Sequence, residues 1–404
     1  MTSDTAPTSE ALDRSLDLLR RASTPHGFVA SPVFDHYAGV WGRDALITSL
    51  GACATSDPAL HEATAASIDT LTTRASPLGQ LPAVVFPERD EWDFGEGGSV
   101  DTTAWLPIAV EAYLSATGDL ERVAGWWPAI ESSIRWLRHL DVTGSGLVSV
   151  APSTDWMDAA LTRSGRTLHV NALFAWSLAA IQRIADVLGF TTDRDAGRIA
   201  RAVDAWFWPD STVEFDSFFE HGFAHTAIRR EYERLASLPR RHYVSHIVHS
   251  AFIDRCDVLA NVIAVLGEVA PPGRAVTITD HLAAAADPWP SRTFLGPILP
   301  GDASGMLITQ ADLAIDPRWS VAPGRYHNAG AWPFVGGLHA AAVAAAAGPA
   351  AARPLLGRVA GALAIDDWAF PEWIDAEGLP QGARQQTWNA GAYVLAYLRI
   401  ERTP

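Results

Sequence analysis

Apolar residues recur along most of the chain at the spacing of amphipathic helices, whereas the alternation typical of β-strands is nearly absent. In the segment 120–140, for example, Val123, Trp126, Ile130 and Leu137 fall on one helical face. The pattern predicts helices at 9–22, 44–54, 58–74, 101–117, 120–140, 167–189, 193–207, 227–237, 251–268, 273–286, 334–347, 350–364 and 388–400. The chain is therefore expected to be all-α.

Short connections between these helices alternate with long ones, which are rich in glycine, proline and acidic residues. Such helices suggest two concentric rings, an (α/α)6 barrel, with the long loops gathered at one end. Because no linker-like stretch divides the sequence, residues 1–404 are expected to form a single domain with lids or insertions at 75–100, 210–250 and 288–332. The sequence has no strict repeat, so a solenoid is the weaker alternative.

Composition narrows the classes of protein that remain. The net charge of -16 at pH 7 argues against nucleic acids and anionic membranes as partners, since these select basic patches. All 30 basic residues are arginine. Without lysine the chain cannot form a Schiff base with pyridoxal phosphate or build a P-loop. The two cysteines, Cys53 and Cys256, lie in apolar helical segments and are expected to be reduced core residues.

The chain shows no sign of membrane targeting. Residues 1–10 are polar and lack the basic and apolar regions of a signal peptide, and no apolar run reaches membrane-spanning length. The sequence therefore predicts a cytoplasmic protein, and it leaves the oligomeric state open.

Two distant loops each place a carboxylate beside an indole: residues 155–158, Asp-Trp-Met-Asp, and residues 371–373, Pro-Glu-Trp. Cleavage of a glycoside requires one protonated carboxyl, which donates to the leaving oxygen, and one ionised carboxyl, which activates water or attacks carbon. We assign Asp158 as the acid and Glu372 as the base, with Asp155 as the rival acid. Inversion is expected, with about 6.5–9.5 Å between the two carboxyls.

Six short motifs carry a resemblance to known families. Three resemble the amylo-alpha-1,6-glucosidase domains of glycogen-debranching enzymes: Trp-Gly-Arg-Asp-Ala-Leu-Ile-Thr at 41–48, Ser-Val-Asp-Thr-Thr-Ala-Trp at 99–105, and Trp-Met-Asp at 156–158 leading to Val-Asn-Ala-Leu at 170–173. Three are similar to the neutral/alkaline invertases: Asp-Phe-Gly-Glu at 93–96, Arg-Tyr-His-Asn-Ala-Gly-Ala-Trp-Pro at 325–333, and Pro-Glu at 371–372 with Gln-Thr-Trp at 386–388. The resemblance implies an (α/α)6-barrel glycosidase with Asp158 as general acid and Glu372 as general base.

The motifs also supply candidates for contacts to a carbohydrate substrate. These are Trp41, Arg43, Asp44, Asp101, Asp155, Trp156, Tyr326, His327, Asn328, Trp332, Gln386 and Trp388. By resemblance, Arg43 and Asp44 hold hydroxyl groups in the terminal subsite, and the indoles supply stacking walls. Asp44 and Asp101 also begin predicted helices, where a carboxylate can simply cap free backbone N–H groups. For the tryptophans, burial in the core is the alternative role.

Departures from both families bear on the substrate. The invertase pattern has two arginines directly after the acid, whereas this chain has Ala159 and Ala160. Debranching relatives usually carry an extra N-terminal domain, whereas barrel helices begin here almost at once. A small α-glucoside or oligosaccharide is therefore the favoured substrate, with sucrose as the alternative.

Histidines at 221, 225, 242, 246 and 249 form a sequence cluster, and the last three would share a face if their segment were helical. No cysteine or flanking carboxylate completes a zinc pattern, so no metal and no cofactor are expected. Structural or lid roles are preferred for these histidines.

Other functions stay open on the sequence alone. A sugar epimerase or lyase on the same helical toroid would abstract a carbon-bound proton with His327 or Tyr326. A carbohydrate-binding protein would bind sugar without turnover, and phosphorolysis would replace water by phosphate.

Overall fold

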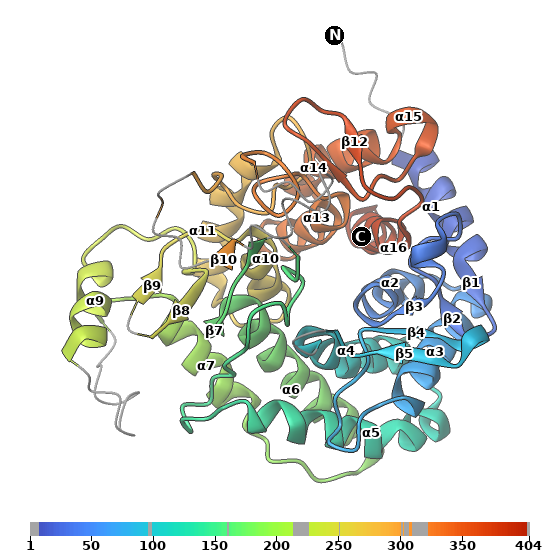
Figure 1. Cartoon of the computed structure of the whole chain (residues 1–404), viewed down its shortest axis with the longest axis horizontal. Helices are drawn as coiled ribbons and strands as arrows, with labels where there is room; N and C mark the ends of the chain where they lie inside the picture. Colours follow the sequence, from blue (N-terminus) through green and yellow to red (C-terminus); the bar gives the residue numbers. More distant parts are fainter. Residues whose placement is uncertain are drawn as a thin grey trace.

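The chain folds into two concentric rings of helices (Figure 1). The computed structural model describes residues 8–95, 99–159, 161–212, 226–249, 251–299, 302, 307–308 and 322–401. The inner ring comprises, in order, α2 (Gly42–Ala54), α4 (Val100–Thr117), α6 (Leu168–Leu188), α10 (Val258–Leu266), α13 (Pro333–Ala347) and α16 (Thr387–Glu401). The outer ring comprises α1 (Thr8–Ala22), α3 (Pro58–Thr73), α5 (Leu120–His139), α7 (Ala196–Phe207), α11 (Pro272–Leu282) and α14 (Pro349–Leu363). The predicted (α/α)6 barrel is confirmed.

The two rings differ in how polar residues are distributed around each helix. On the outer helix α5, the predicted stripe that includes Val123 and Ile130 is buried, and the opposite face is charged. On the inner helix α13, by contrast, every residue from Pro333 to Ala342 is buried. A helix that is apolar on all sides can only be stable inside the protein, so the sequence itself assigns α13 to the inner ring.

The ring closes where α16 packs against α2, the first inner helix. Two glycines permit the contact. A Cβ atom on Gly51 would lie 1.9 Å from the carbonyl oxygen of Gly391, and one on Gly391 would lie 2.6 Å from the Cα atom of Thr48. The two backbones therefore touch directly, and a larger residue at either position would force them apart.

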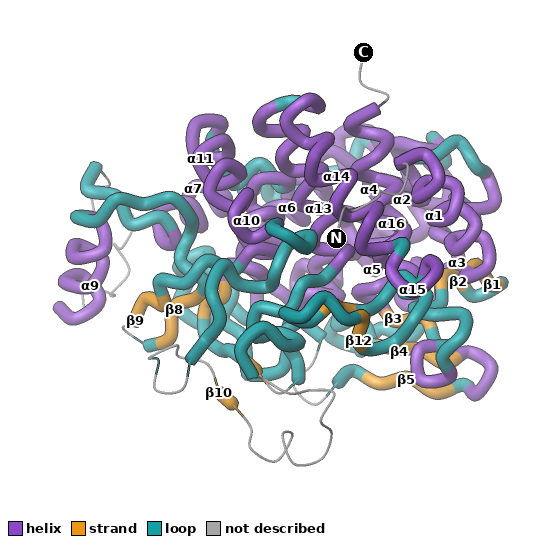
Figure 2. Tube along the Cα trace, turned by 90° about the horizontal axis from the view of Figure 1, so that it is seen from above, coloured by secondary structure: helices purple, strands orange, loops and turns teal. Residues whose placement is uncertain are grey.

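Short strands and long loops gather at one end of the barrel, below the helices in Figure 2. Three-stranded antiparallel sheets are formed by β3 (Val40–Trp41), β4 (Val84–Phe86) and β5 (Glu91–Asp93), and by β7 (Arg166–Thr167), β8 (His246–Val248) and β9 (Ala251–Ile253). Two-stranded pairs join β1 (Ser23–Thr24) to β2 (Gly27–Phe28), β6 (Leu161–Thr162) to β10 (Leu307–Ile308), and β11 (Trp373–Ile374) to β12 (Pro380–Gln381). Since β3 leads into α2 and β7 into α6, these inner helices begin at the loop end.

Most predicted helices are confirmed to within a few residues, and α9 (Thr226–Ala236) matches the one expected at 227–237. The segment 251–268 is an exception, because it begins as strand β9 and becomes helical only at Val258. Asp257 sets that start by accepting a hydrogen bond from the backbone N–H of Ala260. The remaining short elements are η1 (Asp35–Tyr37), η2 (Pro87–Arg89), η3 (Ala283–Ala286) and α15 (Ile365–Trp368).

The shared helical face of three histidines is not formed. His246 lies in strand β8, where it is fully buried and hydrogen-bonded to Ser245. His221 and His225 lie outside the described residues. Among the helices that are described, none has the length and apolarity to cross a membrane.

The glycine contact between α2 and α16 predicts a large difference between two alanine substitutions. Gly391→Ala should lower the free energy of unfolding by about 1–3 kcal/mol, because the new methyl group overlaps backbone atoms of α2. Gly357→Ala on α14 is the matched control, since a Cβ atom there meets nothing within 4 Å, and it should be neutral or stabilising by up to about 1 kcal/mol. Urea unfolding of both variants measures the difference. Equal effects would contradict the close approach.

Candidate active site

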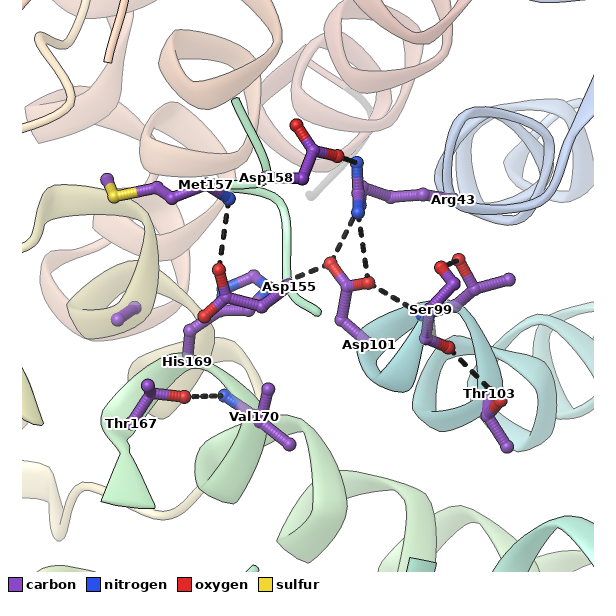
Figure 3. Close-up of polar contacts among 12 residues, drawn as sticks. Arg43, Ser99, Asp101, Thr103, Asp155, Met157, Asp158, Thr167, His169 and Val170 are labelled. Atoms are coloured by element: carbon purple, nitrogen blue, oxygen red, sulfur yellow. Dashed lines mark hydrogen bonds and ion pairs between the residues drawn. The ribbon is translucent and has the colours of Figure 1, made fainter. Parts of the chain in front are cut away.

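The candidate site is built on the first turns of three inner helices (Figure 3). Arg43, in the first turn of α2, donates from Nε and Nη2 to the carboxylate of Asp101 in α4, at 2.7 and 3.1 Å. Its Nη1 donates to Asp158 at 3.2 Å. His169, in the first turn of α6, places Nε2 3.2 Å from Asp101. One arginine thus connects α2, α4 and the loop that carries the predicted acid.

Asp158 is the member of this group that faces solvent. Its side chain is 43% exposed, whereas the side chains of Arg43 and Asp101 are 15% and 0% exposed. Burial by the surrounding protein raises the pKa of Asp158, while the positive charge of Arg43 opposes this and the carboxylate of Asp101 adds to it. A carboxyl that is accessible and holds its proton to higher pH is suited to general acid catalysis.

Glu372 is held by groups on both of its oxygens. Tyr37 donates its hydroxyl proton to Oε1 at 3.2 Å, and the backbone N–H of Ala383 donates to Oε2 at 2.8 Å. Gly382 adopts a positive φ of 72°, and a Cβ atom there would lie 2.3 Å from Oε2. Glycine is therefore required to make room for the carboxylate. Burial and the charge of Glu372 raise the pKa of Tyr37, so the phenol keeps the proton that it donates.

Asp158 and Glu372 share one electrostatic environment although they are distant in sequence. The pKa of Tyr326 is raised by burial and then by Glu372 and Asp158, and the same two carboxylates raise that of Tyr37. Burial raises the pKa of Asp44 to about 7, and both carboxylates add to this shift. Three carboxyls from separate segments therefore act electrostatically on the same two phenols.

Exposed aromatic surface beside Glu372 comes from the loop that precedes α2. The ring of Trp41 contacts those of Tyr37 and His36, with centroid distances of 5.3 and 5.4 Å, and Phe34 is 39% exposed. Trp41 is only half-buried. Tyr37 was missed by the sequence analysis, although the density of aromatic residues just before the motif at 41–48 was a usable signal.

Asp155, unlike Asp158, does not face solvent. It is 2% exposed, accepts a hydrogen bond from the backbone N–H of Met157 at 3.0 Å, and pairs with Nε of Arg163 at 2.8 Å. Arg163 also pairs with Asp257, the N-cap of α10. The predictions of Asp155 as rival acid and as sugar ligand do not fit this burial, since its carboxylate anchors the loop to the barrel.

Asp101 was also predicted to contact sugar. Its side chain is fully buried beneath Arg43, and its oxygens accept hydrogen bonds from Arg43, His169 and the backbone N–H of Thr102. Burial alone would raise the pKa of Asp101, but Arg43 and His169 outweigh that effect and hold the pKa well below its usual range. Asp101 is thus a permanent anion that a substrate cannot reach in this structure.

Three predicted stacking walls lie in an aromatic core. Trp156 is 2% exposed and makes edge contacts with Trp332 and His327, with centroid distances of 5.6 and 5.0 Å. Trp388 stacks on Phe334 with a centroid distance of 4.0 Å. Trp156, Trp332 and Trp388 are thus buried side chains that support the site, and motif matching could not distinguish this role from stacking on sugar.

His327 and Asn328 are buried as well. Burial lowers the pKa of His327 to about 3, so its imidazole is neutral. Its inaccessibility argues against proton abstraction by an epimerase or lyase. The side-chain amide of Asn328 exchanges two hydrogen bonds with the backbone of Ile298, at 2.6 and 2.9 Å, which fixes the loop. Gln386 is buried as well, at 1% exposed. Among these four predicted sugar ligands, Tyr326 is the one whose pKa is raised by Glu372 and Asp158.

The part of the chain that the structure describes contains no group of three or more histidine, cysteine or acidic side chains that could hold a metal ion. No family model matches the chain. The sequence is 24% identical over 348 residues to probable alkaline/neutral invertase F of Arabidopsis thaliana, a match that covers 76% of this chain and 66% of the relative.

Cytosolic invertase 1 of Oryza sativa subsp. japonica is also 24% identical, over 343 residues, and here the match covers 76% of this chain and 59% of the relative. The chain thus spans less than two thirds of the length of these two curated relatives.

Solved structures support the fold over nearly the whole chain. A GH63 mannosylglycerate hydrolase from Thermus thermophilus superposes with a TM-score of 0.65 at 15% identity, over 95% of this chain and 99% of that one. A structure described only as a wild-type glycosidase gives a TM-score of 0.64 at 17% identity, over 100% of both chains. The chain therefore has an (α/α)6-barrel fold and resembles the neutral invertases in sequence.

The raised pKa of Asp44 predicts a pH-dependent stability. An unfolded aspartate has a pKa near 3.9, whereas folded Asp44 has one of about 7, so its ionisation opposes folding. This contribution is absent below about pH 4, grows as the pH rises to 7, and amounts to at most about 4 kcal/mol above that.

Asp44→Asn should therefore stabilise the protein relative to wild type at pH 8 and change it little at pH 4, as measured by urea unfolding at both values. Asp35→Asn, which alters an exposed carboxylate in η1, is the control and should have the same small effect at both. A D44N effect that does not change with pH would contradict the assignment.

Proposed function

We propose that the protein is an inverting glycoside hydrolase that cleaves an α-glucosidic bond in a small α-glucoside or oligosaccharide. The proposal rests on one observation: Asp158 and Glu372 share an electrostatic environment, because both carboxylates raise the pKa values of Tyr37 and Tyr326. Two carboxyls with different surroundings, one exposed and carrying a raised pKa, are what acid–base hydrolysis needs. The invertase relatives and the glycosidase folds support the same reaction class.

Each carboxyl has one role in the proposed reaction. Asp158 transfers its proton to the glycosidic oxygen as the bond between that oxygen and the anomeric carbon breaks. Glu372 takes a proton from water, whose oxygen forms the new bond to the anomeric carbon from the opposite face. Tyr37 and the backbone N–H of Ala383 keep Glu372 oriented toward that water. The separation of about 6.5–9.5 Å that inversion requires remains a prediction.

Arg43, Asp44 and Tyr326 are proposed sugar contacts because they interact with one or both carboxyls. Trp41 is included because its ring packs on Tyr37, which donates to Glu372. Arg43 and Trp41 retain some exposure, whereas Asp44 and Tyr326 lie deeper. Sucrose is the alternative substrate, since both curated relatives are invertases. The proposal includes that residues 1–404 form one catalytic domain and that the protein is cytoplasmic. Release of glucose from glycogen limit dextrin would extend the proposed activity to debranching.

The substrate is tested with purified protein and a panel of sucrose, trehalose, maltose, isomaltose, kojibiose and glycogen limit dextrin, with and without phosphate. Proton NMR of the first turnover should show β-glucose, because inversion of an α-glucoside gives the β-anomer. Initial α-glucose would overturn inversion, and turnover only with phosphate would replace hydrolysis by phosphorolysis.

Removal of either carboxyl should abolish turnover while leaving the fold intact. Asp158→Asn and Glu372→Gln are each expected to lower kcat by about 10²–10⁴-fold or more, since a general acid or base is lost. Glu377→Gln, which alters an exposed carboxylate in the β11–β12 hairpin, is the matched control and should keep wild-type activity. Full activity of D158N or E372Q would refute the assigned role.

A further inference from the structure

His169 has no role in the reaction as proposed above, yet it is linked to the acid through Asp101 and Arg43. It lies in the first turn of α6 and is fully buried. Its Nε2 is 3.2 Å from Oδ2 of Asp101, whereas its Nδ1 has no hydrogen-bond partner among the described residues. Because Asp101 is held as an anion, Nε2 is the atom that donates to it.

The contact with His169 supplies the fourth hydrogen bond to the carboxylate of Asp101. Oδ1 accepts from Nη2 of Arg43 and from the backbone N–H of Thr102, and Oδ2 accepts from Nε of Arg43 and from Nε2 of His169. Each oxygen thus receives two hydrogen bonds, which is the capacity of an ionised carboxylate. Figure 3 shows the three side chains in this arrangement, with Asp158 on the far side of Arg43.

Asp101 determines how Arg43 meets the acid. Two of the nitrogens of Arg43 are fixed in a bidentate pair with Asp101, so only Nη1 is directed to Asp158. The charge of Asp101 also offsets that of Arg43. Without this offset, Arg43 would hold Asp158 more strongly as an anion and would hinder its protonation.

We propose that His169 and Asp101 are positioning residues for the general acid, which fix Arg43 so that it orients Asp158 through one hydrogen bond without keeping it ionised. The proposal rests on the proposed function. Neither residue contacts substrate, since both side chains are buried behind Arg43.

The acid faces several other charged or titratable groups, and these must be considered in any pH effect. Arg43 and Asp44 face it from α2, and Asp101 from α4. Asp155 acts from its own loop, Tyr37 from η1 and Tyr326 from the loop before α13. His169 reaches Asp158 only through Asp101 and Arg43, so replacing it removes none of the groups that act on the acid directly.

The test compares His169→Leu, which removes the donor, with His169→Gln, which keeps an N–H group for Asp101. Two substrates are used: the best glucoside from the panel, whose alkoxide leaving group needs protonation, and α-glucosyl fluoride, whose leaving group depends far less on an acid. H169L should lose about tenfold or more in kcat/KM on the glucoside but less than about threefold on the fluoride.

The pH–rate profile gives an independent readout. In H169L the alkaline limb for the glucoside should move to lower pH, because Arg43 then stabilises ionised Asp158, and H169Q should restore both the limb and most of the rate. Equal losses on the two substrates, or no loss on either, would overturn the proposal, because a general structural defect or a passive histidine would then explain the result.

Failure of the glycosidase assignment is distinguishable from failure of this inference. If the wild type turns over neither substrate, the proposed function fails, and the crystal structure of H169L decides the positioning role. The inference then requires the guanidinium of Arg43 to loosen its bidentate pair with Asp101 and turn toward Asp158. An unchanged arrangement would overturn it.

Discussion

The buried ion pair between Arg43 and Asp101 is the interaction on which the rest of the site depends. Removing two charges from water is costly, and a buried pair persists only where good geometry and further hydrogen bonds compensate for the lost hydration. Here the pair is bidentate, His169 and a backbone N–H complete the carboxylate, and Asp101 lies at a helix N-terminus, where the backbone dipoles favour an anion. The first turns of α2, α4 and α6 are therefore held in a fixed relation, and Asp158 is oriented from them.

The barrel provides the conditions for this pair. The inner helices that start at the loop end bring their N-terminal turns together around the barrel axis. Their apolar faces keep water out of the barrel interior. Side-chain amides then attach the loops to these turns. Asn171 of α6 bonds to both backbone groups of Val148, and Asn261 of α10 accepts from the backbone N–H of Tyr243. Much of what looks like a binding motif in the sequence is thus the attachment of loops to the barrel.

This explains how far the sequence could predict the site. Helix periodicity and caps predicted the helices of both rings to within a few residues, except for the start of α10, and the resemblance pointed to Asp158 and Glu372 as the acid and base. A sequence motif does not show whether a side chain is exposed at the site or buried under it, because the same residues fit both positions. Asp101, Trp156 and His327 were predicted to contact substrate because they belong to the same motifs as the candidate site residues, yet packing buries them. Tyr37 and His169 escaped notice for the converse reason, because their partners, Glu372 and Asp101, are hundreds or tens of residues away.

The charge balance of the site points to acid–base chemistry independently of any relative. Asp44, Asp158 and Glu372 act electrostatically on the same two phenols, and the charge of Arg43 is offset by Asp101. Three ionised carboxyls in so confined a region would repel one another, so a proton is retained among them near neutral pH. Asp44 is buried whereas Asp158 is open to solvent, so Asp158 is the more accessible of these two carboxyls. Asp158 and Glu372 thus have different surroundings, which is what the proposed acid–base reaction requires.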